Sequence, residues 1–255
     1  LRQLAKNGVV AKKGGPLHEY VTDSILALQN RSSADIMRVQ FGWADNDTKF
    51  IVGEREITVD AVYHTPASTA TAPYARYMEP KGTIEKWREA FSIYNRKGLE
   101  IQAFAALSGF GAPLLKFTGQ KGAIINLVYK DSGSGKTTVL RMANSICGDP
   151  EQLLGLAEDS APGRINKLGF FNNIAYPMDE LTNMDGKELG VLAYACSQGK
   201  GREKASVHAN INRKNDITWR TITITTSNAS FYQKLLNIKT SPDGELMRII
   251  EFVIE

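Results

Sequence analysis

Residues 130–138, KDSGSGKTT, combine glycines, a lysine and two hydroxyls in the order that phosphate-binding loops use. The two glycines, Gly133 and Gly135, let successive backbone N–H groups turn toward an anion, and the helix expected after them adds its dipole. Lys136 would reach the β- and γ-phosphates of a nucleotide, and the hydroxyl of Thr137 would ligate Mg²⁺. The predicted ATP-binding residues are Asp131, Ser132, Gly133, Ser134, Gly135, Lys136, Thr137 and Thr138.

Lys130 stands where the first glycine of this pattern is usual. It lies at the exit of the preceding strand, whereas the backbone that approaches phosphate belongs to the later positions. We therefore expect the loss of this glycine to matter little. The alternative interpretation of the stretch is a polar Gly/Ser turn before an amphipathic helix.

An acidic pair follows the loop in the stretch IAYPMDEL, residues 174–181. Asp179 would hold Mg²⁺ through water, and Glu180 would orient or deprotonate the attacking water in ATP hydrolysis. The alternative is an acidic pair at the start of the next helix. Pro177 weakens the strand signal before the pair, because proline cannot donate to a strand ladder.

Two further polar residues follow in the order that such a site needs. Asn228 ends the alternating run TITITTSN and is predicted to contact the attacking water or the γ-phosphate, although Asn also commonly ends strands in turns. Arg248 precedes the last strand-like run, where it would stabilise transition-state charge at a neighbouring subunit's nucleotide. The alternative for Arg248 is a surface ion pair.

A basic segment lies between the acidic pair and Asn228, at residues 198–220. ASVHANI and DITWRTITI flank NRKN, a pattern that predicts a hairpin with a basic tip. Such residues would grip a nucleic-acid backbone without sequence preference, and the alternative is a solvated basic loop. The predicted DNA-binding residues are Lys200, Arg202, Lys204, His208, Arg213 and Lys214.

The elements around these residues predict an α/β fold. Strands at 123–129, 172–180 and 219–228 alternate with helices at 136–147 and 186–198, which indicates a mostly parallel sheet flanked by helices. Further helices are expected at 83–97 and 99–117, the second mostly apolar and so buried.

The chain changes character near residue 80. A helix at 17–30 and a β-rich stretch at 35–60, broken by a polar turn at Asp45–Asp47, precede a proline-bearing linker or long loop at 63–82. We therefore predict a small α+β N-terminal domain over 1–80 and a P-loop-type ATPase core over 81–255.

Composition sets the limits of these interpretations. The net charge of +4 permits an anionic partner without requiring one, and no apolar run approaches the ~20 residues that span a bilayer. Cys147 and Cys196 lie far apart without other ligands, which favours a reducing, cytoplasmic compartment. Trp43, Trp87 and Trp219 lie in apolar patterns, so core packing is expected for all three. The lack of an initiator Met indicates a piece of a longer protein.

The ordered set of Lys136-Thr137, Asp179-Glu180, Asn228 and Arg248 resembles AAA+ ATPases, and more narrowly the superfamily 3 helicases of viruses and mobile elements. With the stretches KGTIEKWREAF, MANSICGDP and GKGREKA, the chain looks like a family of phage and prophage replicative primase-helicases, catalogued as a domain of unknown function. The resemblance covers almost the whole chain.

That resemblance implies a homo-oligomeric ring, a hexamer, with ATP and Mg²⁺ between subunits and single-stranded or forked DNA in the central channel. It further implies a primase domain elsewhere in the full-length chain and, for a phage protein, the host cytoplasm. Arg202 is a second candidate for contacting nucleotide across the subunit interface. Two rival functions stay open: an AAA+ ATPase that remodels or loads a protein partner, and a nucleotide-binding scaffold without hydrolysis.

Overall fold

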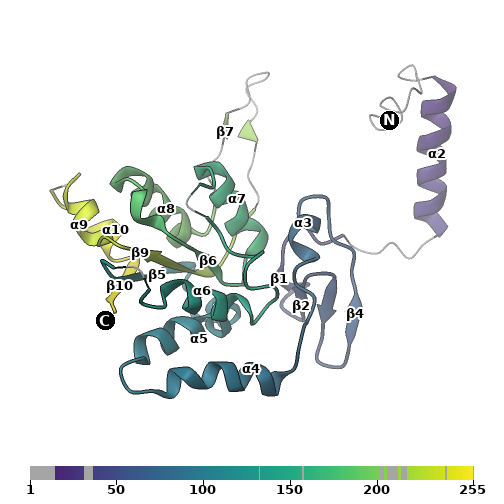
Figure 1. The fold of residues 1–255 in the computed structure, drawn as a ribbon. Coiled ribbons are helices and arrows are strands. Elements are labelled where there is room, and N and C mark those ends of the chain that lie inside the picture. Colours follow the sequence, from purple (N-terminus) through teal and green to yellow (C-terminus); the bar gives the residue numbers. More distant parts are fainter. Residues whose placement is uncertain are drawn as a thin grey trace. The chain divides into compact units, whose positions relative to one another are not determined.

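The computed structural model describes residues 15–31, 37–131, 133–156, 158–201, 204–205, 212–213, 217–238 and 240–254. The chain forms two compact units, Leu1–Met37 and Arg38–Glu255. Within the first unit, α2 (Pro16–Arg31) confirms the helix expected at 17–30 (Figure 1). Proline suits its first position, because that residue's N–H has no partner within a helix.

The second unit begins with a four-stranded antiparallel sheet. Its strands are β1 (Gly42–Ala44), β2 (Lys49–Val52), β3 (Arg55–Ile57) and β4 (Val62–His64), which pair in sequence order. The polar turn expected at Asp45–Asp47 is confirmed, since all three of its residues have positive φ angles, from 50° to 67°. Asp and Asn tolerate this conformation better than most side chains.

Four charged side chains brace this sheet. Arg38 pairs with Asp45 at 2.7 Å and with Glu56 at 2.8 Å, and Lys49 pairs with Glu56 at 2.6 Å. The hydrogen bond from Arg38 is the main reason that the pKa of Asp45 falls to about 2. The network connects Arg38, which lies ahead of β1, to the turn after β1 and to β3, and connects β2 to β3 through Lys49 and Glu56.

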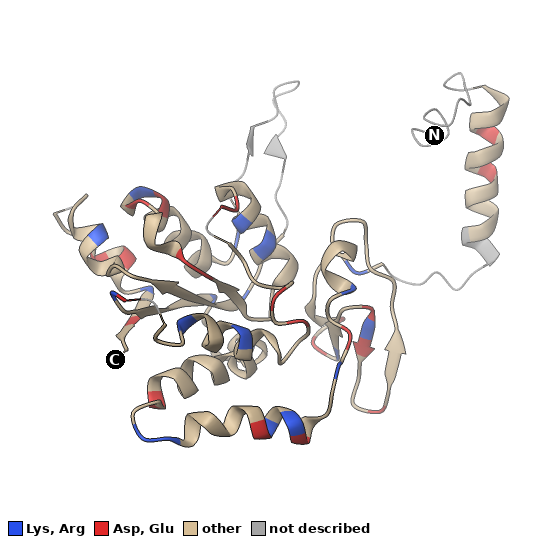
Figure 2. Ribbon diagram, in the orientation of Figure 1, with Lys and Arg blue, Asp and Glu red and all other residues tan. Residues whose placement is uncertain are grey.

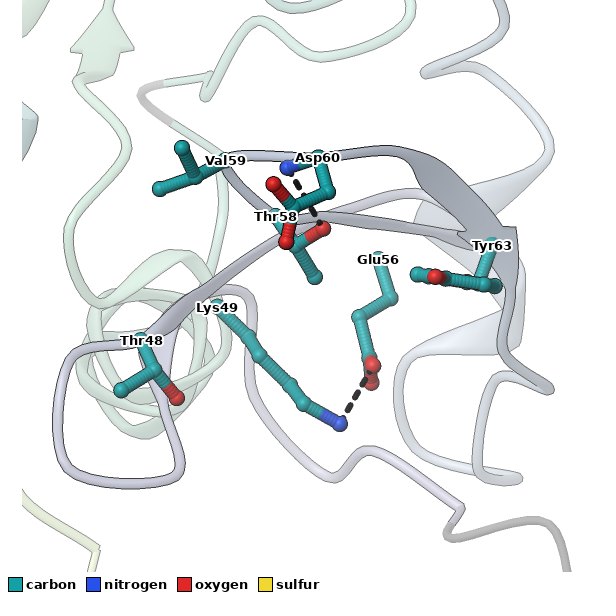
Figure 3. Close-up of a pocket in the computed structure, with 7 residues that line it drawn as sticks. All are labelled: Thr48, Lys49, Glu56, Thr58, Val59, Asp60 and Tyr63. Atoms are coloured by element: carbon teal, nitrogen blue, oxygen red, sulfur yellow. Dashed lines mark hydrogen bonds and ion pairs between the residues drawn. The ribbon is translucent and has the colours of Figure 1, made fainter.

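A surface pocket of about 600 Å³ lies on this sheet. Figure 3 shows the Lys49–Glu56 ion pair within it. Its lining residues are Thr48, Lys49, Glu56, Thr58, Val59, Asp60 and Tyr63. None of them is a residue for which the sequence predicts chemistry.

The segment that follows is only partly the loop expected over 63–82. It holds the end of β4 and the short helix α3 (Ala72–Ala75), and Ala75 and Met78 are buried in the core. Helix α4 (Ile84–Phe91) starts at Thr83, whose side chain caps the N–H of Lys86, and continues into η1 (Ser92–Asn95). These two elements confirm the helix expected at 83–97.

Helix α5 (Glu100–Leu114) and η2 (Leu115–Thr118) confirm the next expected helix, but the expected burial applies to only one of its faces. Its small residues, among them Ala105, Gly109 and Ala112, form the buried face. A Cβ atom on Gly109 would lie 3.0 Å from the carbonyl oxygen of Ala143, so this glycine permits close packing against α6. The large side chains on the other face are 44–60% exposed: Phe104, Leu107, Phe110 and Leu114.

A second, parallel sheet lies at the centre of the unit, with strand order β10-β5-β9-β6. Its strands are β5 (Gly122–Val128), β6 (Tyr176–Met178), β9 (Thr221–Ser227) and β10 (Ile249–Val253). The predicted parallel sheet flanked by helices is thereby confirmed. Strand β6 is shorter than the stretch expected at 172–180, and it tolerates Pro177 because it lies at an edge of the sheet.

Helices cover both faces of this sheet (Figure 1). On one face Ile124 packs in a core with α7 (Ala161–Phe171) and α8 (Gly186–Gln198). On the other face Ile125 packs with α5 and α6 (Lys136–Asn144). Consecutive strand residues thus enter opposite cores, as the two-residue period of a strand requires. The remaining elements are η3 (Leu181–Asn183), α9 (Phe231–Leu236) and α10 (Asp243–Leu246).

The two sheets of the second unit share a core. Phe41, Ile51 and Met78 belong to the same hydrophobic cluster as Leu168 and Phe171. Trp43 also donates its backbone N–H to the side chain of Asn173 at 3.0 Å. The division of the chain at residue 80 stays a prediction, while residues 38–80 pack as part of the second unit.

Of the three tryptophans expected in the core, Trp219 belongs to a core cluster of the described residues, whereas Trp43 and Trp87 do not. Trp219 is 2% exposed. Trp43 and Trp87 are half-buried among aromatic rings, and their indole N–H groups donate to the carbonyl oxygen of Pro113 and the hydroxyl of Ser145.

Figure 2 shows the charged residues spread over the helices and loops around the central sheet. Among the described residues, no helix has the length and apolar character needed to cross a membrane.

Candidate functional site

The glycine-rich loop connects β5 to α6, which is the strand–loop–helix context that a phosphate-binding loop requires. Gly133 and Gly135 have φ angles of 84° and 82°, and a Cβ atom at either position would meet no other atom within 4 Å. Their backbone conformation therefore requires glycine, and the space in front of them is open. Lys130 is exposed and is not among the described residues with positive φ, so it replaces glycine there without backbone strain.

Lys136 is 7% exposed and points back into its own loop. Its ammonium group donates to the carbonyl oxygens of Tyr129 at 2.9 Å and Asp131 at 3.1 Å. Helix α6 starts at Gly135 without a side-chain cap, and the buried hydroxyl of Ser134 has no hydrogen-bond partner among the residues that the structure describes. The described part of the loop thus leaves this hydroxyl unsatisfied, as expected of an anion site.

The other predicted loop residues lie around this lysine. Thr137 is half-buried in the first turn of α6, and Thr138 and Asp131 are exposed. Ser132 falls outside the described residues.

Asp179 and Glu180 leave the carboxyl end of β6 in a strained turn. Glu180 has φ 55° and ψ 48°, a left-handed conformation that costs a non-glycine residue about 1–2 kcal/mol. Its backbone N–H donates to the hydroxyl of Thr226 at 2.9 Å, and that hydroxyl donates to the carboxylate of Asp179. Thr226 is fully buried, so the sheet fixes this turn from below. The turn leaves the Glu180 side chain exposed to solvent, with Asp179 partly buried beside it.

Asn228 follows the carboxyl end of β9. Its backbone N–H donates to the hydroxyl of Thr182 at 2.8 Å. Its side-chain Oδ1 is buried and has no partner among the described residues. An unsatisfied buried amide oxygen is costly, so it indicates a polar group that completes the site when bound.

The strand order brings these residues together. Strand β9 lies between β5 and β6, with Val128 paired to Ser227 and Met178 paired to Thr225. All three strands are parallel, so the loop, Asn228 and Asp179-Glu180 lie together at the carboxyl ends of the strands. Because neighbouring strands are about 4.8 Å apart, β5 and β6 are separated by roughly 10 Å.

Arg248 lies at the amino ends of the strands, opposite to the phosphate loop. It precedes β10, whose first residue pairs with Ile124 near the amino end of β5. Its guanidinium group lies 4.6 Å from the ring centre of Tyr194, and its Nε donates to the hydroxyl of Ser197 at 2.5 Å. Within one chain, the structure therefore does not bring Arg248 to the loop.

The basic segment contains a pair of short strands, as expected of a hairpin. Strands β7 (Lys204–Ala205) and β8 (Asn212–Arg213) pair antiparallel, with Lys204 opposite Arg213. The expectation that NRKN forms the tip is wrong, because its first two residues, Asn212 and Arg213, belong to β8. Exposed Lys200 bridges Thr218 at the base of the hairpin. Arg202, His208 and Lys214 lie outside the described residues.

Sequence reasoning missed the residues that support the site from below. The hydroxyl of Thr226 accepts the N–H of Glu180, and that of Thr182 accepts the N–H of Asn228. Both threonines lie in strand and turn patterns that indicate no such role. The run TITITTS carried one signal: two consecutive threonines break the alternation at the end of β9, and Thr226 is the second of them. The 3₁₀ turn that places Thr182 had no such signal.

The residues present fit a nucleoside triphosphate with Mg²⁺. Open space before Gly133 and Gly135 lies at the carboxyl end of the strands with a lysine and a carboxylate pair. The hydroxyl of Ser134 and the Oδ1 of Asn228, which have no partner within the described part of the chain, lie there too. Lysine and backbone N–H groups suit phosphate oxygens, whereas hydroxyl and carboxylate oxygens suit Mg²⁺.

A family model described as a domain of unknown function, DUF927, matches residues 1–216. The chain belongs to the DUF927 family. The match includes the phosphate-loop candidate and Asp179-Glu180, whereas Asn228 and Arg248 lie beyond its end. No curated protein matches the sequence of this DUF927 chain.

Among solved structures, this DUF927 chain is similar to Cch of SCCmec type IV, which is described as an active helicase. The TM-score is 0.66 at 20% sequence identity, and the similarity covers 99% of this chain and 46% of that one. The chain thus spans just under half of the length of Cch, and at this identity the likeness concerns the fold.

Proposed function

We propose that this DUF927 chain is the ATP-dependent helicase module of a mobile-element or phage replication protein, a AAA+ ATPase of the superfamily 3 type. The observation that carries the proposal is the meeting of the glycine-rich loop, Asp179-Glu180 and Asn228 at one edge of a parallel sheet. Similarity of the fold to Cch, itself described as an active helicase, supports the choice of helicase over other ATPases.

The chain's residues divide the work of ATP hydrolysis as follows. The N–H groups of the loop and the ammonium of Lys136 bind the phosphates. The hydroxyl of Thr137 and the carboxylate of Asp179 hold Mg²⁺, which when bound neutralises charge on the phosphate oxygens. Glu180 accepts a proton from the attacking water, and the amide of Asn228 holds that water or the terminal phosphate.

Nucleotide binding would change the hydrogen bonds of Lys136. To reach phosphate, Lys136 must exchange the carbonyl oxygens of Tyr129 and Asp131 for phosphate oxygens. These carbonyls keep the ammonium solvated in a buried position while no anion is bound. The lysine is therefore held ready next to the loop that it completes.

DNA would be engaged by the basic segment, which leaves the sheet at the edge opposite to the nucleotide residues. Trp219 anchors its base, since its N–H donates to the carbonyl of Gly199 at 2.9 Å. A homo-hexameric ring would place these hairpins around single-stranded or forked DNA and would place Arg248 or Arg202 next to a neighbour's nucleotide. The contacts would be to phosphates and so would weaken steeply with salt.

The test is ATP hydrolysis by the purified protein with and without single-stranded DNA, together with a variant in which Arg213 and Lys214 are replaced by Glu. We expect DNA to stimulate hydrolysis and the double variant to lose that stimulation while it keeps its basal rate. Stimulation by a protein substrate but not by DNA would favour the remodelling ATPase. Nucleotide binding without hydrolysis in an assembled ring would favour the scaffold.

A further inference from the structure

Three carbonyl oxygens of the turn after Glu180 converge on a single side chain. The ammonium of Lys234 donates to the carbonyl of Met184 at 2.9 Å, to that of Thr182, and at 3.4 Å to that of Leu181. These carbonyls belong to η3 and the residue after it; that of Leu181 also accepts the backbone N–H of Met184 at 3.2 Å. An ammonium group has three donors, so the match of donors to acceptors is complete.

Lys234 is itself fixed to the central sheet. It lies on α9, whose first N–H, that of Phe231, donates to the carboxylate of Glu251 at 2.7 Å. The same carboxylate accepts from the side chains of Ser230 at 2.5 Å and Asn126 at 2.9 Å. Since Asn126 lies on β5 and Glu251 on β10, α9 starts from a network in the strand that leads into the phosphate loop.

The turn at residues 181–184, which Lys234 holds, adjoins both Glu180 and Asn228. Glu180 directly precedes Leu181 and holds its left-handed conformation where the turn begins. Thr182 accepts the backbone N–H of Asn228 at 2.8 Å. Any movement of this turn would therefore displace the carboxylate of Glu180 and the amide of Asn228 together.

Burying the ammonium of Lys234 costs desolvation free energy, which packing alone does not explain. The ammonium is partly withdrawn from water, and this burial lowers the pKa of Lys234. It lies 5.9 Å from the ring centre of Phe231. What only a cation supplies here is simultaneous bonding to several carbonyls, which fixes the path of the backbone.

We propose that Lys234 is a positioning residue, which holds the turn 181–184 so that Glu180 and Asn228 face the bound nucleotide. The inference rests on the proposed function, because positioning matters only if this edge hydrolyses a nucleotide. It does not extend to nucleotide binding, which the loop and Lys136 carry from the other strand.

The experiment compares Lys234→Met and Lys234→Arg with the wild-type protein, and uses Lys187→Met as the control. Lys187 is an exposed lysine on α8, so its replacement removes the same charge without touching the turn. Four quantities are measured: the melting temperature, the Kd for ATP, kcat for hydrolysis, and amide hydrogen exchange over residues 179–185.

For Lys234→Met we expect a Kd within about twofold of wild type and a kcat lower on the order of 10- to 100-fold, the scale of a small misplacement. Exchange over 179–185 should become faster, while the rest of the second unit keeps its protection. Arginine, which also donates to several carbonyls, should restore part of kcat. Lys187→Met should match wild type in all four quantities.

Two results would overturn the inference: unchanged kcat and unchanged exchange in Lys234→Met, or a loss of kcat that follows general loss of protection across the unit. If the wild-type protein binds ATP but never hydrolyses it, the proposed function fails instead. The exchange data would then decide separately whether Lys234 fixes the turn.

Discussion

The hydroxyl of Thr226 accepts the backbone N–H of Glu180 at 2.9 Å. Thr226 belongs to β9, which lies between β5 and β6. A fully buried side chain of β9 thus fixes the backbone at the end of β6. The same hydroxyl donates to Asp179 and thereby orients the carboxylate assigned to Mg²⁺. One threonine thus determines the direction of both members of the acidic pair.

Replacing Thr226 with Val should keep the shape of the strand but remove both hydrogen bonds. We expect a loss of about 1–3 kcal/mol of stability, because the Glu180 N–H and the Asp179 carboxylate each lose one hydrogen bond and keep only the one between them. Hydrolysis should fall more than nucleotide binding does. Urea unfolding and steady-state kinetics measure the two effects, and Thr226→Ser, which keeps the hydroxyl, should behave nearly as wild type.

Replacing Lys136 with Ala should abolish ATP binding. The variant loses the only side-chain cation that, among the described residues, reaches into the loop, and the carbonyls of Tyr129 and Asp131 lose their donor. Isothermal calorimetry with ATP and Mg²⁺ should show a Kd raised at least on the order of 100-fold, given the usual strength of charge-assisted bonds. Lys130→Ala is the matched control, because Lys130 is exposed at the strand exit and should leave the Kd unchanged.

Replacing Glu251 with Gln should destabilise the protein. The carboxylate accepts three hydrogen bonds, from Asn126, Ser230 and the N–H of Phe231, and an amide would set a donor against one of these donors. The expected cost is about 1–3 kcal/mol in the free energy of unfolding, measured with urea. Glu79→Gln, at an exposed position, should cost almost nothing. Equal stability of the two variants would mean that the network does not hold α9.

The thiol of Cys196 should resist alkylation in the folded protein. It is 1% exposed, and burial raises its pKa to about 12. In the unfolded chain a thiol titrates near about 8.5. Stability from this group is therefore present below about pH 8.5 and is lost as the pH rises toward 12, because only the unfolded thiol ionises readily.

Two measurements check this prediction. Mass spectrometry after treatment with N-ethylmaleimide at pH 8 should find the Cys196 peptide modified in urea but not in buffer. The urea midpoint should fall between pH 8 and pH 10. Rapid labelling of native protein at Cys196 would show that the thiol is more accessible than its packing indicates.

The sequence predicted the features that depend on local pattern. Glycine at positions 133 and 135, alternating threonines in β9 and apolar runs in β5 each indicated their element directly, so the loop context and the parallel sheet are confirmed. Asp179 and Glu180 were found because they end an apolar run. Their meeting with Asn228 depends on the strand order, which no local pattern encodes.

Features that depend on tertiary packing escaped prediction. Helix α5 is apolar on all sides, so its composition could not indicate that Phe104 and Leu114 remain on the outside. The predicted hairpin tip NRKN was wrong because Asn212 and Arg213 pair with Lys204 and Ala205, and that pairing is not encoded by local turn propensity. Thr182 lies in a short 3₁₀ turn and Lys234 in the short helix α9, and their roles depend on partners about 50 residues away.

The central claim is that the acidic pair of β6 hydrolyses ATP bound at the loop of β5. It is tested most directly by replacing Glu180 with Gln and measuring ATP hydrolysis and ATP binding on the same preparation. The replacement keeps the size of the side chain but removes the base, so kcat should fall on the order of 100- to 10,000-fold with the Kd for ATP preserved. Hydrolysis at the wild-type rate in Glu180→Gln would contradict the account.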